Sequence, residues 1–302
     1  MNSLLPNGIY PPLPTFFDGD GELDIATLQR HMHRLVESGI AGYVLMGSNG
    51  EAVHLTSDER VRLVEAAREI VEHEASAMPL IAGCGEQSTH ATIANCRSAA
   101  HYGADTALVL PPFYYKGCMN TQALLSHYRA VADESPLPIL IYNMPGSTAG
   151  LDLDAATICT LATHPNIIGV KDSAGNIAKL AEIVANVPDT FKVFAGSAGY
   201  LLPALVVGAV GAVSALANVF PQEVCDVQAL FDTGQFDEAR MLQARLVPAN
   251  AAVTTMYSVP GLKAALELVV GYGGSPRLPL QSLNAQERMK LAKMLQSVQG
   301  EQ

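Results

Sequence analysis

Short apolar runs alternate with longer amphipathic stretches along the chain. Eight runs are typical of strands, the first being the weakest, and they span residues 9–16, 42–46, 79–82, 106–110, 137–142, 167–171, 191–195 and 210–214. Apolar positions at helical spacing fill most of the gaps, at 24–38, 57–74, 89–102, 121–134 and 152–163. Strands this apolar must be covered on both faces, so the pattern predicts a parallel sheet covered by helices.

A glycine follows several of the helical stretches and precedes a strand run. Gly39, Gly103 and Gly208 lie in such positions and are typical of helix caps before a tight turn. Eight repeated units of this kind predict an α/β fold, a (β/α)8 TIM barrel closed on itself. A doubly wound open sheet is the alternative, but no Gly-x-Gly-x-x-Gly motif opens an early helix.

The strand signal stops after Asn218, and only helical patterns follow. These patterns cover residues 219–233, 236–247, 261–271 and 285–298. We therefore expect the barrel to occupy residues 1–224 and a C-terminal helical segment to occupy residues 225–302.

Composition and charge exclude several classes of partner. The 302 residues carry a net charge of −11 and no basic run, which argues against nucleic acid as a partner. An anionic substrate would have to be held by local dipoles. The five cysteines show no Cys-x-x-Cys or Cys/His ligand spacing, which favours a reduced, cytoplasmic location. Residues 1–6 do not resemble a signal peptide, and prolines, glycines and polar residues break the apolar stretch 200–220, so no membrane span is expected.

Lys171 ends one of the apolar strand runs, which is an unusual place for a lysine. Burial disfavours the ammonium form and lowers the pKa of a lysine, which makes the amine nucleophilic. Such an amine is what Schiff-base chemistry on a ketone requires. Gly169 has the same strand parity, so we expect it to face the barrel interior and to leave room for a group bound to Lys171. The alternative interpretation is a strand-end lysine paired with Asp172 or with solvent.

Two further features lie where neighbouring strands end. Tyr142 ends the fifth strand run, and its phenol is able to move protons near the amine, although a half-buried packing role is the simpler interpretation. Gly47-Ser-Asn-Gly-Glu51 follows the second run. Its small residues allow backbone amides to converge on an anion, with Ser48 and Asn49 adding polar contacts. A turn of this composition often has no binding role, which is the alternative interpretation.

Four motifs in order along the chain carry a family resemblance. They are Gly-Ser-Asn-Gly-Glu from 47, Pro-Pro-Phe-Tyr-Tyr from 111, Tyr-Asn-Met-Pro from 142 and Gly-Val-Lys-Asp-Ser from 169. From about Ile9 to Leu280 the chain resembles the dihydrodipicolinate synthase/N-acetylneuraminate lyase family of class I aldolases. The resemblance implies a barrel in a homotetramer or homodimer that needs no cofactor and no metal.

The same resemblance implies roles for individual residues. Lys171 would form the Schiff base and Tyr142 would transfer protons. Ser48 and Asn49 would bind the carboxylate of a pyruvate moiety. Tyr114 would reach the site of a neighbouring subunit, with Tyr115 as the alternative in the adjacent register.

Departures from the synthase pattern point to another branch of the family. Synthases typically have Thr-Thr where this chain has Ser48-Asn49, and an Arg where it has Ser147. Val-Lys-Asp-Ser from 170 and Ala-Gly-Ser-Ala-Gly from 195 resemble 4-hydroxy-2-oxoglutarate aldolase, which implies that Ser173 and Gly196 also line the substrate site. Tyr142-Asn143 departs from the Tyr-Ser of that enzyme.

The expected reaction is cleavage of a 4-hydroxy-2-oxo acid, a small-molecule substrate, to pyruvate and an aldehyde such as glyoxylate. Synthesis of dihydrodipicolinate precursors from pyruvate and aspartate semialdehyde is one alternative, and cleavage of a 2-keto-3-deoxy sugar acid is another. A metal-dependent class II aldolase would need clustered ligands, whereas the eight histidines lie mostly in helical stretches. A non-catalytic sensor of sugar acids is a further alternative, which Lys171 and Tyr142 together argue against.

Overall fold

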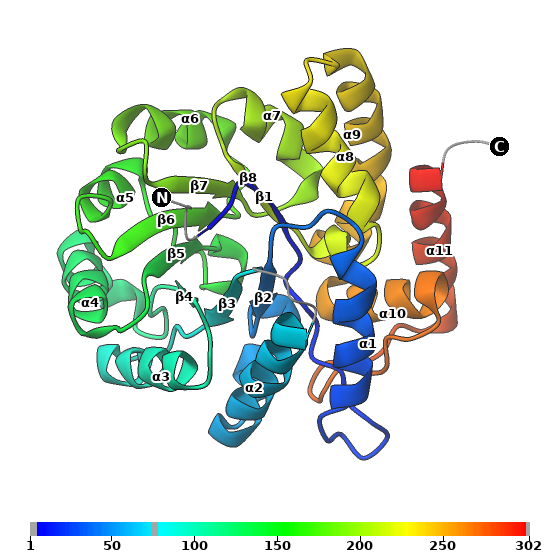
Figure 1. The fold of residues 1–302 in the computed structure, drawn as a ribbon, viewed down its shortest axis with the longest axis horizontal. Helices are drawn as coiled ribbons and strands as arrows, with labels where there is room; N and C mark the ends of the chain where they lie inside the picture. The colour runs from blue at the N-terminus through cyan, green and yellow to red at the C-terminus, as the bar shows by residue number, and fades with distance from the viewer. Residues whose placement is uncertain (1–4, 74–77, 300–302) are drawn as a thin grey trace.

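Eight parallel strands form the centre of the computed structural model, which describes residues 5–73 and 78–299. The strands are β1 (Gly8–Tyr10), β2 (Tyr43–Leu45), β3 (Leu80–Gly83), β4 (Thr106–Val109), β5 (Ile139–Asn143), β6 (Ile167–Asp172), β7 (Lys192–Ala195) and β8 (Gly211–Val213). They pair in the order β1-β8-β7-β6-β5-β4-β3-β2, and a parallel bridge from Pro12 to Val44 closes the ring. The predicted (β/α)8 TIM barrel is confirmed (Figure 1).

Helices cover the outside of this barrel. They are α1 (Ile25–Val36), α2 (Ser57–His73), α3 (Thr89–His101), α4 (Thr121–Glu134), α5 (Ala155–Leu161), α6 (Ile177–Asn186), α7 (Leu201–Val206) and α8 (Pro221–Asp232). The predicted helical stretches omit α6, although its sequence is amphipathic, and α7, which is a short helix inside an apolar stretch that contains Pro203. The predicted end of α2 at Glu74 lies outside the described residues.

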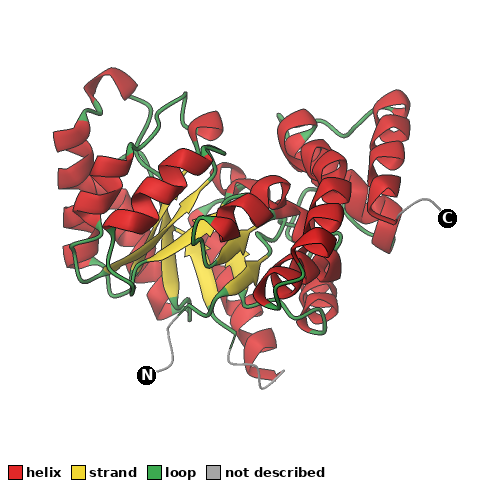
Figure 2. Ribbon diagram, turned by 90° about the horizontal axis from the view of Figure 1, so that it is seen from above, coloured by secondary structure: helices red, strands yellow, loops and turns green. Residues whose placement is uncertain are grey.

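Three more helices, α9 (Phe236–Ala251), α10 (Ser258–Val270) and α11 (Ala285–Gln299), follow the barrel. They lie to one side of it, with α10 and α11 on the side of α1 (Figures 1 and 2). A C-terminal helical extension is therefore present, and its division from the barrel at residue 224 stays a prediction. None of the described helices is both long and apolar enough to cross a lipid bilayer.

Local signals in the sequence set the limits of these elements. The side chains of Asp24, Ser88 and Asn120 each accept a hydrogen bond from a backbone amide in the first turn of α1, α3 and α4. The predicted caps Gly39, Gly103 and Gly208 have φ values of 76°, 103° and 98°, a region that favours glycine. The first strand is shorter than the predicted 9–16, because Pro11 and Pro12 have no amide to continue the ladder.

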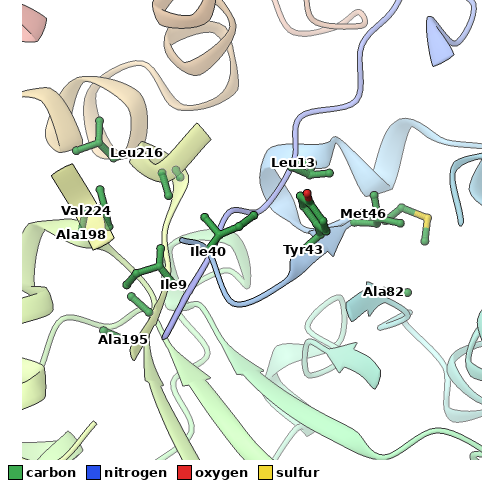
Figure 3. Close-up of a cluster of buried hydrophobic side chains, with 14 of the residues drawn as sticks. Ile9, Leu13, Ile40, Tyr43, Met46, Ala82, Ala195, Ala198, Leu216 and Val224 are labelled. Atoms are coloured by element: carbon green, nitrogen blue, oxygen red, sulfur yellow. The ribbon is translucent and has the colours of Figure 1, made fainter. Parts of the chain in front are cut away.

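The hydrophobic core has two layers, because side chains alternate between the two faces of each strand. The inner layer fills the barrel and contains Leu5, Tyr10, Val44, Ile81, Leu108, Leu140, Tyr142, Phe194 and Val213. The outer layer lies between the strands and the helices. Figure 3 shows part of it, where Ile9 and Ala195 from the strands lie near Leu216 and Val224 from the chain after β8, and Tyr43 lies near Leu13 and Met46.

His31 in α1 is a buried polar group that ties the helix to two distant segments. Its Nδ1 lies 3.0 Å from the Tyr272 hydroxyl, and its Nε2 lies 3.0 Å from Oδ1 of Asn218. Burial lowers the pKa of His31 from 6.5 to about 3. The folded chain therefore holds this ring neutral at a pH where the unfolded chain has already bound a proton.

We expect the free energy of unfolding to fall as the pH drops from about 6.5 towards 3, in part because of His31. Between these values the unfolded state binds more protons, and one group contributes up to about 1.4 kcal/mol per pH unit. Urea unfolding between pH 7 and pH 4 should show a smaller pH dependence in a His31→Gln variant than in the parent. If the free energy of unfolding changed equally with pH in the two proteins, His31 would not contribute to the pH dependence.

Candidate active site

Lys171 and Tyr142 lie side by side where β5 and β6 end. The two residues are register partners in the sheet. Lys171 Nζ lies 3.8 Å from the centroid of the Tyr142 ring, and the two residues are only 3 % and 4 % exposed. The lysine predicted from sequence is thus buried at the strand end, against the predicted tyrosine.

Asp172 does not pair with Lys171, although that pairing was the alternative interpretation of the sequence. The Asp172 carboxylate forms an ion pair with Lys179 of α6 at 2.7 Å and accepts a hydrogen bond from Nδ2 of Asn143 at 2.8 Å. Among the described residues no ion pair involves Lys171. Asp172 points away from the barrel interior because successive strand residues face opposite sides, so its pairing leaves Lys171 on the inner side.

Gly169 faces the interior as predicted, but the expected space beside it is absent. A methyl group on this residue would lie 2.3 Å from the carbonyl oxygen of Lys192 and 3.0 Å from Cδ1 of Leu140. The glycine is therefore needed for close approach of β7 and for packing of the inner layer. A group bound to Lys171 would need its room above the residue, towards the mouth of the barrel.

The turn after β2 reaches the same mouth. Ser48, Asn49 and Gly50 form a short 3-10 helix, η1 (Ser48–Gly50). Ser48 Oγ lies 3.2 Å from the Tyr142 hydroxyl. The backbone amides of Ser48 and Asn49 have no hydrogen-bond acceptor among the described residues, whereas the Gly50 amide donates to Gly47. Two amides and two polar side chains are thus available next to Tyr142.

Ser173 and Gly196 meet at the ends of β6 and β7. Ser173 Oγ is buried and has no hydrogen-bond partner within the described part of the chain. A methyl group on Gly196 would lie 1.9 Å from that oxygen, so only glycine leaves the serine hydroxyl in place. The Gly196 amide donates to the Asp172 carbonyl at 2.7 Å, which fixes the two loops together.

Tyr114 is not brought to this group of residues within one chain. It lies on the loop after β4 and is 76 % exposed, and its ring makes an edge contact with Tyr115 at 5.1 Å between centroids. The side-chain oxygen of Gln87 accepts hydrogen bonds from the Phe113 and Tyr114 amides at 2.9 Å and so holds the loop. Ser147, which the resemblance aligns with an Arg of synthases, is exposed after β5.

A polar network behind the site, buried except for the exposed Asp152, was not predicted from the sequence. Asn143 Nδ2 donates to Asp152 at 2.6 Å as well as to Asp172, and Lys179 Nζ lies 2.7 Å from Asp152. The network joins β5, β6 and α6 and fixes the strand ends that carry Tyr142 and Lys171. The signal was available, because Asn143 and Asp172 are the polar residues directly after the two predicted site residues.

No three His, Cys, Asp or Glu side chains in the described ranges, 5–73 and 78–299, are placed to share a metal ion. All five cysteines are free thiols.

The model of the dihydrodipicolinate synthetase family matches residues 5–298. The chain belongs to this family.

Known members of the dihydrodipicolinate synthetase family resemble the chain over almost its whole length. A protein of Emericella nidulans named "Probable 4-hydroxy-2-oxoglutarate aldolase, mitochondrial" is 42 % identical over 291 residues, 96 % of this chain and 94 % of that protein. The L-threo-3-deoxy-hexylosonate aldolase of Hypocrea jecorina is 39 % identical over 92 % of this chain and 91 % of its own. The crystal structure of a dihydrodipicolinate synthase from Bacillus anthracis superposes with a TM-score of 0.91 at 32 % identity, covering 96 % and 98 % of the two chains. Together the family and these relatives support a lyase of the aldolase type.

Proposed function

We propose that this chain is a class I aldolase that forms a Schiff base through Lys171 and cleaves a 4-hydroxy-2-oxo acid. The placement of Lys171 Nζ 3.8 Å from the ring centroid of Tyr142, whose hydroxyl is 3.2 Å from Ser48 Oγ, is the main support. This arrangement supports the proposal because an amine, a phenol and the turn of Ser48 and Asn49 lie together at the carboxyl ends of the strands, where barrel enzymes carry out their chemistry.

The residues suggest the following steps. The neutral amine of Lys171 attacks the 2-oxo carbon. Tyr142 gives its phenol proton to the leaving hydroxyl, and loss of water gives an iminium that withdraws electrons. The Tyr142 phenolate then takes the proton of the C4 hydroxyl, the C3–C4 bond breaks, and its electron pair forms an enamine. The aldehyde leaves, a proton returns to C3, and hydrolysis releases pyruvate from Lys171. The free amides and side chains of Ser48 and Asn49 hold the substrate carboxylate throughout, within a chain of net charge −11.

Cleavage of 4-hydroxy-2-oxoglutarate should exceed condensation of pyruvate with aspartate semialdehyde. Ser147 replaces the guanidinium that would grip the second substrate of a synthase through two hydrogen bonds. Ser173 Oγ, which is buried and has no hydrogen-bond partner in the described part of the chain, would instead contact the distal part of the substrate. The values of kcat/KM for both reactions, with pyruvate detected by a coupled assay, give the comparison.

A higher kcat/KM for the condensation would contradict the aldolase assignment. Cleavage of only a longer 2-keto-3-deoxy sugar acid, the substrate type in the name of the Hypocrea jecorina relative, would keep the Lys171 chemistry and change the substrate.

We also propose that Tyr114 completes the site of a second copy of the chain. The ring is exposed on a loop that Pro111, Pro112 and the Gln87 side chain hold in place. Aromatic residues with a polar end are frequent at protein interfaces. The assembly would be a homodimer or a dimer of dimers.

Mixing two weakly active variants should recover part of the activity. A Lys171→Ala subunit supplies Tyr114, and a Tyr114→Phe subunit supplies Lys171, so subunit exchange creates sites with both groups. Replacing Tyr114→Phe by Tyr115→Phe in the mixture is the matched control, since Tyr115 lies on the same loop and is also exposed. A fully active monomer in sedimentation at assay concentration would rule out the shared site.

A further inference from the structure

Glu51 is a buried carboxylate directly after the turn that carries Ser48 and Asn49. Its backbone is left-handed, with φ of 53°, and the turn is preceded by a second left-handed residue, Met46, with φ of 51°. Neither is glycine, so this backbone persists only where its surroundings hold it. The turn therefore depends on contacts outside itself.

The Glu51 carboxylate supplies these contacts. Its Oε1 forms an ion pair with Nζ of Lys263 at 2.7 Å, and both side chains are almost completely excluded from solvent. Its Oε2 accepts a hydrogen bond from the Arg277 amide at 2.9 Å and lies 3.1 Å from Nδ1 of His54. A buried carboxylate with three partners is fixed in position.

Lys263 belongs to α10, a helix outside the barrel that packs against η1. Its Nζ also donates to the Ser275 carbonyl at 2.9 Å and lies 4.5 Å from the centre of the Phe17 ring. Burial is the largest influence on the pKa of Lys263 and lowers it, while the Glu51 carboxylate acts in the opposite direction. The Glu51 carboxylate thus stabilises the charge of the buried Lys263 side chain.

Arg277 fixes the far side of this arrangement. Its guanidinium lies 2.6 Å from the Glu59 carboxylate, a contact that lowers the pKa of Glu59 to about 2, and 4.2 Å from the centre of the Phe17 ring. The amide that binds Glu51 is therefore held by a segment anchored on α2.

We propose that the Glu51–Lys263 ion pair positions the substrate-carboxylate turn, so that α10 outside the barrel determines how tightly the site binds the pyruvate moiety. The inference rests on the proposed role of Ser48 and Asn49. Glu51 and Lys263 are positioning residues: they act on the substrate through the turn.

The test measures borohydride trapping of the imine against pyruvate concentration, together with kcat, KM and urea unfolding. In Glu51→Gln and in Lys263→Met the pyruvate concentration for half-maximal trapping should rise by at least roughly tenfold, since a contact to a charged group is lost. The kcat at saturation should change less, because Lys171 and Tyr142 remain. Both variants should also unfold more easily, because each leaves one buried charge without its partner.

The double variant Glu51→Gln/Lys263→Met separates positioning from stability. It leaves no unpaired charge, so unfolding should return towards that of the parent, while the raised half-maximal concentration should remain. A pyruvate affinity that recovers together with stability would show a purely structural role and overturn the inference. Glu51→Asp, which keeps the charge on a shorter side chain, should give an intermediate rise, and it carries the test if the other variants do not fold.

Arg68→Met is the matched control. Arg68 pairs with Asp105 at 2.6 Å, and Asp105 also accepts from the Leu80 amide at the start of β3, at the end of the barrel away from the site. This variant should lose stability with unchanged pyruvate affinity. A parent protein that forms no adduct at any pyruvate concentration would contradict the proposed function instead, which keeps the two failures distinct.

Discussion

Borohydride reduction in the presence of pyruvate should attach one pyruvate-derived group to Lys171. The lysine is 3 % exposed and lies over the Tyr142 ring, and among the described residues it has no carboxylate partner. Mass spectrometry of the digested protein should find the adduct on the peptide that contains Lys171. Lys171→Ala and Lys171→Arg should both lose the adduct, and turnover should fall by roughly a thousandfold or more, since neither side chain acts as the nucleophile.

Two other lysines make this experiment specific. Lys179 in α6 forms ion pairs with Asp152 and Asp172 at 2.7 Å each, so its amine should carry no adduct. Lys192 begins β7 at the opposite end of the barrel, where its Nζ donates to Asn7, and Lys192→Ala should keep both adduct and turnover. An adduct on either residue, or an active Lys171→Ala protein, would contradict the proposal.

The Tyr142→Phe variant should still form the imine but turn over roughly 10²–10⁴-fold more slowly. The ring that contacts Lys171 is retained, whereas the hydroxyl 3.2 Å from Ser48 Oγ is lost. Single-turnover measurements would separate the two steps, with trapping by borohydride reporting imine formation and aldehyde release reporting bond cleavage.

Tyr128→Phe is the matched control for Tyr142→Phe. Tyr128 in α4 is fully buried, and its hydroxyl donates to the Val109 carbonyl at 3.0 Å. Loss of this hydrogen bond should lower stability by about 1 kcal/mol and leave turnover nearly unchanged. A Tyr142→Phe protein slowed by no more than tenfold would place proton transfer on another group or on water.

Strand parity and strand-end position were enough to predict that Lys171 and Tyr142 meet. Both depend on local sequence, because parallel neighbouring strands end at the same edge of the barrel. The space beside Gly169 was predicted wrongly, since it depends on the Lys192 carbonyl of the next strand, which no local pattern reveals.

Contacts between segments far apart in the chain could not be predicted from the sequence either. Glu51 and Lys263 come from opposite ends of the chain, and Lys263 stands out only as a charged residue in an apolar helix. The role of Tyr114 depends on a second copy of the chain, so it stays a prediction. The short helix α7 was not predicted, because an apolar stretch without polar positions shows no helical periodicity.

The side chains that fill the barrel also restrict the path by which small molecules reach or leave Lys171. Tyr10 and Phe194 meet edge to face at 5.4 Å in the inner layer, where Phe194 is the register partner of Lys171, and neither ring is exposed, so side chains fill the barrel interior beside the lysine. Substrate, water and both products of a cleavage would share one opening. The aldehyde would have to leave before water reaches the remaining enamine and its imine, which sets an order of release. Attempts to change the aldehyde partner should therefore target the loops around this opening, since substitutions deeper in the barrel would alter only packing.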